Sequence, residues 1–165
     1  MKSSKSNLPK VTSRLVALQI LYSGDFFEKE YYELVQEDYL DKYKKGEIYS
    51  DFVQDGELIV EPDEAFLKKL LQTTSSNLTE VDHYITEHIK KGWTLDKLDP
   101  IVRSILRLAI TEMLYFGDIP IKVILDQYVS LTNDFYVADE VGFVNGVLDS
   151  IAKIVRKDKD DKDIA

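Results

Sequence analysis

The segment PIVRSILRLAITEMLYF, residues 100–116, predicts a helix that is apolar on nearly every side. Asp99 can cap the free backbone N–H groups of its first turn, and Pro100 suits a first helical position. A helix that is apolar around most of its circumference belongs in the middle of a domain, with neighbours on several sides. The sequence therefore places this segment at the centre of the fold.

A narrow polar stripe interrupts that apolar surface. It consists of Arg103, Ser104, Arg107 and Thr111. Two arginines one turn apart repel each other modestly, so an anion beside them would stabilise both. Asp99, one turn before Arg103, is one candidate for this anion, and a phosphate group is the other. The simplest explanation of the stripe by itself is a structural salt bridge at a helix surface.

Length and composition indicate one domain of ordinary size. The chain has 165 residues, of which 44% are hydrophobic, so it can bury a sizeable core. It contains no cysteine, which excludes disulfides, thiolate metal sites and a cysteine nucleophile. No apolar run approaches the length of a membrane span, and no signal-peptide pattern opens the chain. We expect a soluble, cytoplasmic protein that does not associate with membranes.

The net charge of −9 is unevenly distributed along the chain. Residues 1–24 carry four basic residues and no acidic one, whereas residues 25–65 carry fourteen acidic residues and four lysines, a net of −10. Overall acidity argues against nonspecific affinity for nucleic acid. The distribution nevertheless leaves room for a local basic site on an acidic body.

Hydrophobic periodicity predicts an all-α fold of about seven helices with short connections. A flexible basic arm is expected at residues 1–11, a single helical domain at residues 12–157 and a solvated charged tail at residues 158–165. The expected helices span residues 12–24, 28–45, 62–76, 78–92, 100–116, 121–135 and 139–156, with a loop at 46–62 and a short apolar connection at 93–98. Thr79 and Asp82 resemble a capping box at the start of their helix.

The sequence carries no catalytic motif. Its seven glycines are scattered and form no phosphate-binding loop, and there is no serine nucleophile elbow. His83 and His88 are five residues apart, so they do not share a helix face as a metal-binding pair would. We therefore expect neither an enzyme nor a bound cofactor or metal.

The last predicted helix, residues 139–156, carries a more informative pattern. Its apolar stripe consists of Val144, Val147, Leu148, Ile151 and Val155. Phe143 lies at the edge of this stripe, one turn after Asp139, and Gly142 and Gly146 lie on the back of the helix. A glycine inside a helix costs about 1 kcal/mol relative to alanine, so something should compensate for two of them.

Two explanations of these glycines remain open at the level of the residues. Close packing of a neighbouring helix is the commoner one. Alternatively, the glycines leave a bare surface that a ligand backbone can approach, flanked by the ring of Phe143 and the amide of Asn145. Aromatic stacking combined with amide hydrogen bonding is a common way of reading single-stranded RNA.

Several ordered motifs are similar to those of the NusB family of transcription antitermination factors. They are ALQILYS at 17–23, WTLDKLDPIVRSILRLA at 93–109, DIP at 118–120 and FVNGVLD at 143–149. The resemblance extends from about Thr12 to Ile154. It implies an all-helical fold of two packed sub-bundles. It also implies binding to the boxA element of nascent ribosomal RNA together with the ribosomal protein NusE, which keeps RNA polymerase from terminating early.

The resemblance also implies an RNA-binding site. Phe143, Asn145 and Arg107 match RNA-contacting positions, Asp139 matches a position associated with altered antitermination, and Tyr22 ends a motif beside this surface. Family members often begin with an arginine-rich segment, which is thinned here to three lysines and one arginine. The predicted RNA-binding residues are Lys2, Lys5, Lys10, Arg14, Tyr22, Arg103, Arg107, Asp139, Phe143, Asn145 and Gly146. Residues 40–62 have no match and receive no role.

An alternative function is a protein-interaction module of the same fold in which RNA binding is weak or lost, as the acidity of the chain would allow. A NusB-like domain also occurs fused to ribosomal RNA cytosine methyltransferases. Those enzymes need a large additional domain with a catalytic cysteine, and a chain of 165 residues without cysteine excludes one here. Both a monomer and a homodimer are compatible with the sequence.

Overall fold

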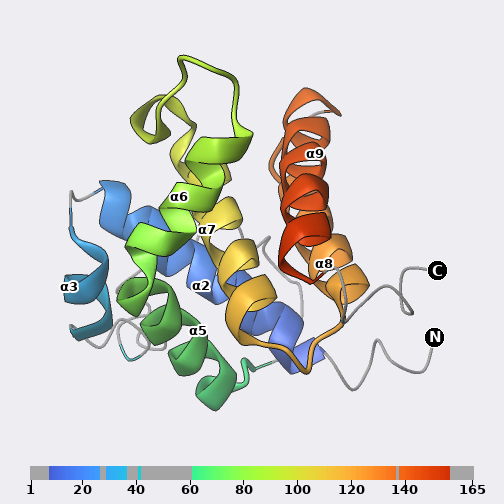
Figure 1. The fold of residues 1–165 in the computed structure, drawn as a ribbon. Helices are drawn as coiled ribbons and strands as arrows, with labels where there is room; N and C mark the ends of the chain where they lie inside the picture. The colour runs from blue at the N-terminus through green and yellow to red at the C-terminus, as the bar shows by residue number, and fades with distance from the viewer. Residues whose placement is uncertain (1–7, 27–28, 37–40, 42–60, 137, 157–165) are drawn as a thin grey trace. The chain divides into compact units, whose positions relative to one another are not determined.

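The computed structural model describes residues 8–26, 29–36, 41, 61–136 and 138–156, and every regular element in these ranges is a helix (Figure 1). The elements are α2 (Leu8–Phe26), α3 (Tyr31–Gln36), α5 (Glu64–Ser76), α6 (Leu78–His88), the 3-10 helix η1 (Leu95–Lys97), α7 (Pro100–Tyr115), α8 (Ile121–Asn133) and α9 (Ala138–Val155). The predicted all-α class is confirmed. No described helix is both long enough and apolar enough to cross a membrane.

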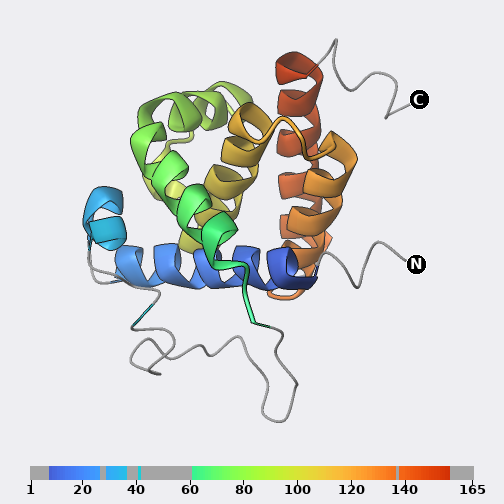
Figure 2. The same ribbon diagram turned by 90° about the horizontal axis from the view of Figure 1, so that it is seen from below.

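The helices form two compact units, Met1–Ser76 and Asn77–Ala165. In the N-terminal unit, α2 packs against α5, and α3 contacts both (Figure 2). In the C-terminal unit, α7 contacts α6, α8 and α9, and the last two also pack against each other (Figure 1). The central position predicted for residues 100–116 is therefore confirmed within the C-terminal unit. The assignment of residues 12–157 to a single domain stays a prediction.

Helix α2 begins at Leu8, four residues before the predicted start. Pro9 fits its first turn because the N–H groups there have no partner inside the helix. Ser13 lies inside the helix, and its hydroxyl donates to the Pro9 carbonyl at 2.8 Å. The flexible arm predicted for residues 1–11 is therefore wrong for 8–11, while residues 1–7 lie outside the described residues.

Helix α2 also continues past Gly24, which was expected to end it, as far as Phe26. This glycine allows a close approach rather than a helix end. A Cβ atom at Gly24 would lie 2.4 Å from Cδ1 of the buried Leu34 on α3, which is too close for any real contact. The absence of a side chain at Gly24 thus lets α3 pack directly onto α2.

Helix α5 begins at Glu64, two residues after the predicted start at Pro62. The Asp63 carboxylate accepts a hydrogen bond from the Phe66 N–H at 3.0 Å, which satisfies a free donor of the first turn. The Asp63 N–H donates to the Ser13 hydroxyl at 2.8 Å and fixes the start of α5 against α2. Of the helix predicted at 28–45, the structure shows α3, and the loop predicted at 46–62 lies almost entirely outside the described residues.

The start of α7 is as predicted. Pro100 is its first residue, and the Asp99 carboxylate accepts hydrogen bonds from the N–H groups of Ile101 at 2.9 Å and Val102 at 3.3 Å. Side chains on all sides of the helix are buried, namely Val102, Ser104, Ile105, Leu106, Arg107, Leu108, Ala109, Ile110, Thr111, Glu112 and Met113. Each fully buried leucine or isoleucine contributes about 1.5–3 kcal/mol.

Two tyrosine hydroxyls join α7 to its neighbours. Tyr128 of α8 is fully buried and donates to the buried Glu112 carboxylate. Tyr115, at the end of α7, donates to Glu80 of α6 at 2.7 Å, and this bond raises the pKa of Tyr115 to about 12. The apolar contacts of α7 are thus supplemented by polar contacts that fix its rotation between α6 and α8.

The C-terminal end of α7 is closed by Arg156, which follows α9. Its guanidinium is buried and donates to the carbonyls of Met113 at 2.8 Å, Glu112 at 3.0 Å and Phe116 at 2.8 Å, and also to that of Ile119. The last carbonyls of a helix have no partner inside it and carry partial negative charge. One arginine therefore satisfies the helix end and holds the turn that follows it.

The helix predicted at 78–92 begins at Leu78 as predicted but ends four residues early. Helix α6 ends at His88, because Lys90 to Trp93 form a turn in which Gly92 has a positive φ of 91°. The capping box predicted for Thr79 and Asp82 is wrong: no side chain caps α6, and the Asp82 carboxylate bonds an arginine of α7 instead. A long-range charge partner outcompetes a local backbone donor here.

Replacement of Arg156 by methionine tests how strongly this contact supports the fold. Arg156→Met keeps the apolar stem but leaves buried carbonyls without donors, so we expect the free energy of unfolding to fall by about 3 kcal/mol or more. Lys153→Met is the matched control, because Lys153 forms only an exposed ion pair with Asp149 on the same helix. Urea denaturation monitored by circular dichroism measures both, and equal midpoints would contradict the role given to Arg156.

Candidate nucleic-acid interface

The outer face of α9 carries four of the predicted RNA-binding residues. Asp139, Asn145 and Gly146 are exposed, and Phe143 is half-buried, as expected for a residue at the edge of the apolar stripe. The opposite face consists of Val144, Val147, Leu148, Ile151 and Ala152, which are buried. Packing of that stripe against α7 and α8 fixes the rotation of α9 and so determines which side chains its outer face presents.

The two glycines of α9 lie in open space. No described atom comes within 4 Å of a Cβ built at Gly142 or Gly146. Close helix packing, one of the two explanations of these glycines, is therefore wrong for the described part of the chain. The other explanation, a bare backbone surface beside an aromatic ring and an amide, fits the geometry.

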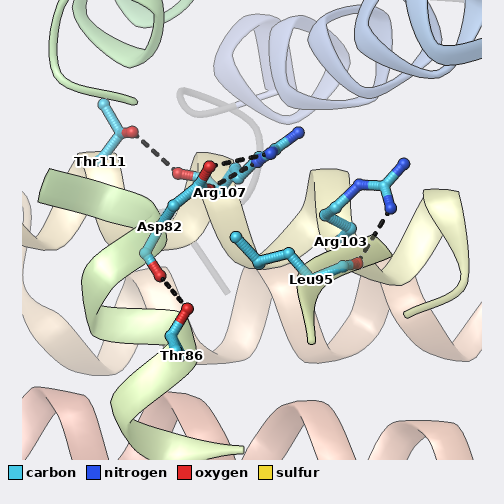
Figure 3. Close-up of polar contacts among 6 residues, drawn as sticks. All are labelled: Asp82, Thr86, Leu95, Arg103, Arg107 and Thr111. Atoms are coloured by element: carbon cyan, nitrogen blue, oxygen red, sulfur yellow. Dashed lines mark hydrogen bonds and ion pairs between the residues drawn. The ribbon is translucent and has the colours of Figure 1, made fainter. Parts of the chain in front are cut away.

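One arginine of the polar stripe of α7 is paired with a carboxylate of α6. Arg107 donates from Nε to Oδ1 of Asp82 at 2.8 Å and from Nη2 to Oδ2 at 2.9 Å, so the pair is bidentate (Figure 3). The two side chains are only 11% and 19% exposed. The anion beside Arg107 is thus Asp82, while Asp99, the candidate named from the sequence, caps the helix. Thr111, further along the stripe, donates to the Arg107 carbonyl at 2.8 Å.

Arg103 points to the connection between α6 and α7. Its Nη1 donates to the Leu95 carbonyl at 3.0 Å, and the side chain is half-buried (Figure 3). Ser104, between the two arginines, is fully buried. Most of the polar stripe thus stabilises the C-terminal unit from inside, and a direct contact of Arg103 or Arg107 with RNA stays a prediction.

The N-terminal unit holds the remaining predicted residues that the structure describes. Arg14 is 3% exposed, and its guanidinium carbon lies 5.2 Å from the ring centroid of Phe66. The ammonium of Lys10 lies 5.5 Å from the same centroid, within the range of a cation–π interaction. Both are helical residues of α2, as is the half-buried Tyr22. Arg14 is therefore not part of an extended basic arm, and Lys2 and Lys5 lie outside the described residues.

The structure thus places the predicted residues on three helices. Asp139, Phe143, Asn145 and Gly146 share α9, Arg103 and Arg107 share α7, and Lys10, Arg14 and Tyr22 share α2. Sequence reasoning missed the partners Asp82 and Phe66, because nothing local marks a residue that pairs with a distant helix. Among the described residues no group of three or more acidic, histidine or cysteine side chains could hold a metal ion.

Residues 11–153 match the NusB family model. The chain belongs to the NusB family. Transcription antitermination protein NusB of Caulobacter vibrioides is 31% identical over 90% of this chain and 95% of its own length. NusB of Allorhizobium ampelinum is 33% identical over 87% of this chain and 86% of its own length.

Solved structures of NusB proteins share the fold. T. maritima NusB has a TM-score of 0.68 and 27% identity, with 94% of this chain and 95% of that chain covered. A complex of the antitermination factors NusB and NusE with double-stranded RNA contains a chain with a TM-score of 0.67. That chain is 24% identical, with 88% of this chain and 97% of that one covered.

The contribution of the Arg107–Asp82 pair to the stability of this NusB-family protein can be measured in the absence of RNA. We expect Arg107→Ala to lower the free energy of unfolding by about 3 kcal/mol, because it leaves a largely buried carboxylate unpaired. The double variant Asp82→Ala/Arg107→Ala should recover about 1–3 kcal/mol relative to the sum of the single changes. Thermal and urea unfolding of the four proteins measures this coupling, and additive effects would refute the pairing.

The open back of α9 predicts opposite effects of alanine at two glycines. Gly146→Ala should raise the free energy of unfolding by up to about 1 kcal/mol, because it removes a helix-interior glycine without a clash. Gly24→Ala, the control, should lower it by about 1–3 kcal/mol, because the added methyl group overlaps Leu34. Denaturation midpoints give the sign of each change in the free energy of unfolding. Destabilisation by Gly146→Ala would reveal a neighbour packed on α9.

Proposed function

We propose that this chain is a transcription antitermination factor that binds the boxA element of nascent ribosomal RNA together with the ribosomal protein NusE. Acting in the cytoplasm within the transcription elongation complex, it keeps RNA polymerase from terminating early. Its role is binding rather than catalysis. Membership of the NusB family and relatives named as antitermination proteins support this proposal.

The outer face of α9 is the observation that carries the proposal. Two glycines leave the helix backbone bare, and Phe143 and Asn145 flank it with a ring and an amide. One base of single-stranded RNA can stack on the ring, while the amide, on the other side of the glycines, can donate to and accept from the edge of another base. The bare backbone lets the sugar–phosphate chain approach without a collision with side chains.

The charge of the chain explains why a protein partner is needed. The net charge is −9, Arg107 is paired with Asp82, and Arg14 is buried against Phe66. Affinity for RNA that comes from neutralised phosphates is therefore small. NusE would supply a second surface for the same RNA, so the protein alone should bind weakly and the pair more tightly.

The same acidity favours the second candidate function, a protein-interaction module with weak or lost RNA binding. Fourteen acidic residues lie between positions 25 and 65. In that case the protein would bind NusE without increasing the affinity of the complex for boxA RNA. A titration of boxA RNA with the protein, with NusE and with both distinguishes the two functions.

Phe143→Ala is the decisive substitution for the RNA-binding function. Because the side chain is only half-buried, we expect a small loss of stability, whereas the loss of a stacked base should cost about 1–3 kcal/mol of RNA affinity. Fluorescence anisotropy of labelled boxA RNA, measured in the presence of NusE, gives the affinity. Ile154→Ala is the control, because Ile154 is an exposed apolar residue in the last turn of the same helix.

Wild-type affinity of Phe143→Ala for boxA RNA would remove α9 from the RNA site. Loss of affinity accompanied by a fall of several kcal/mol in stability would instead identify Phe143 as a core residue, since a Phe-to-Ala cavity in a core costs about 3–5 kcal/mol. Thermal unfolding of the same preparation separates these two outcomes.

A further inference from the structure

The connection between α6 and α7 carries an exposed aromatic side chain, Trp93. The sequence predicts a short apolar connection at residues 93–98, yet only Leu98 is buried and Leu95 is half-buried. Trp93 is 47% exposed. The connection extends beyond the end of α6 as a loop (Figure 1). Its largest side chain is thus placed where a ligand can reach it.

Two hydrogen bonds hold this loop in shape, one within the loop and one from α7. The Trp93 N–H donates to the Lys90 carbonyl at 2.9 Å across a turn whose third residue, Gly92, has a φ of 91°. Arg103 of α7 donates to the Leu95 carbonyl at 3.0 Å and anchors the second half of the loop (Figure 3). A preordered loop loses little conformational entropy when it binds a ligand.

The loop is also basic, in contrast to the chain as a whole. Lys90, Lys91 and Lys97 are exposed, and Asp96 is the one acidic residue among residues 90–98, so the segment has a net charge of +2. A hydrogen bond from the Thr94 hydroxyl, together with a backbone hydrogen bond, lowers the pKa of Asp96. The lysines lie on both sides of Trp93, as they would in a site for a polyanion.

The loop and the start of α9, whose outer face is the proposed RNA contact, lie at the same end of the C-terminal unit. Asp99 ends the loop and begins α7, and its carboxylate accepts a hydrogen bond from the Tyr136 hydroxyl just before α9 begins. The first turns of α9, which carry Phe143, therefore start beside the loop's end (Figure 1). Because residues 99 and 136 are in contact, one strand of RNA can reach both the loop and the start of α9.

The surroundings of Trp93 favour a nucleic acid over a protein. An aromatic anchor of a protein interface is usually buried in an apolar patch with charged residues excluded from its centre. Here the side chains at positions 90, 91, 94, 96 and 97 are all polar and exposed. An exposed ring between lysines is instead typical of proteins that stack bases of a single strand and neutralise its phosphates.

We propose that residues 89–98 form a second contact for single-stranded RNA, in which a base stacks on Trp93 while Lys90, Lys91 and Lys97 face the flanking phosphates. This inference rests on the proposed function in taking RNA as the ligand. The contact is tolerant of sequence, because every base has a face that can stack and the lysines recognise only phosphate.

Trp93 reports directly on its own contact, because it is the single tryptophan of the chain. Titration of the full-length protein with a boxA RNA extended by uridines should quench its fluorescence. Trp93→Ala should weaken binding, measured by anisotropy, by about 5- to 150-fold. Trp93→Phe retains a ring and should stay close to wild type. Because the side chain is exposed, we expect both variants to keep the wild-type melting temperature.

The lysines are tested by the dependence of affinity on salt. Lys91→Ala should reduce the slope of log affinity against log salt by about 0.7, the contribution of one phosphate contact on a single strand. Lys122→Ala is the matched control, since Lys122 is an exposed lysine of α8 away from the loop. Equal slopes for the two variants would overturn the phosphate contact.

The outcomes separate this inference from the proposed function. RNA binding with unchanged Trp93 fluorescence and wild-type affinity of Trp93→Ala would overturn the second contact and leave the function intact. Quenching by NusE but not by RNA would overturn it in favour of a protein partner. No RNA binding by the wild-type protein would overturn both. Quenching that persists in Phe143→Ala, at higher RNA concentration, would support two separate contacts.

Discussion

The arrangement of helices in the C-terminal unit depends on the hydrogen bonds that the guanidinium of Arg156 donates. This group is buried after the end of α9 and donates to four carbonyls in and beyond the last turn of α7. An arginine suits this position because its planar fork presents several donors at fixed angles and keeps its charge when buried. The contact fixes the position of α9 along the axis of α7. Together with the buried stripe of α9, it determines that the glycines, Phe143 and Asn145 face outward.

All three arginines that the structure describes in the C-terminal unit bind protein groups. Arg103 holds the Leu95 carbonyl, Arg107 holds Asp82, and Arg156 holds the end of α7. The unit thus uses arginine to stabilise itself, and the exposed cations around Trp93 are lysines. Lysine recognises phosphate as a point charge, without the bidentate geometry of arginine. In the proposed function, recognition of RNA would therefore rely more on stacking and amide hydrogen bonds than on a strong positive field.

Local signals in the sequence predicted the elements that local physics controls. Asp99 and Pro100 marked the start of α7 to the residue, and the apolar stripe of α9 placed Phe143 at its edge. Two of the errors arose where distant residues decide the outcome. Gly24 looked like a helix end but permits contact with Leu34, and Asp82 looked like a cap but pairs with Arg107. Neither partner can be found from spacing along one helix, because both come from another part of the fold.

The two proposed RNA contacts differ in what they can read. The outer face of α9 offers the Asn145 amide, which can distinguish base edges, whereas the loop around Trp93 offers only a ring and positive charge. Sequence preference should therefore reside in the nucleotides at α9, and those at the loop should add affinity alone. Because the bond between Tyr136 and Asp99 holds the starts of α9 and α7 together, a selective contact and a tolerant one lie at the same end of one unit. A short selective contact extended in this way gains affinity for RNA from one small basic loop, which suits a chain with a net charge of −9.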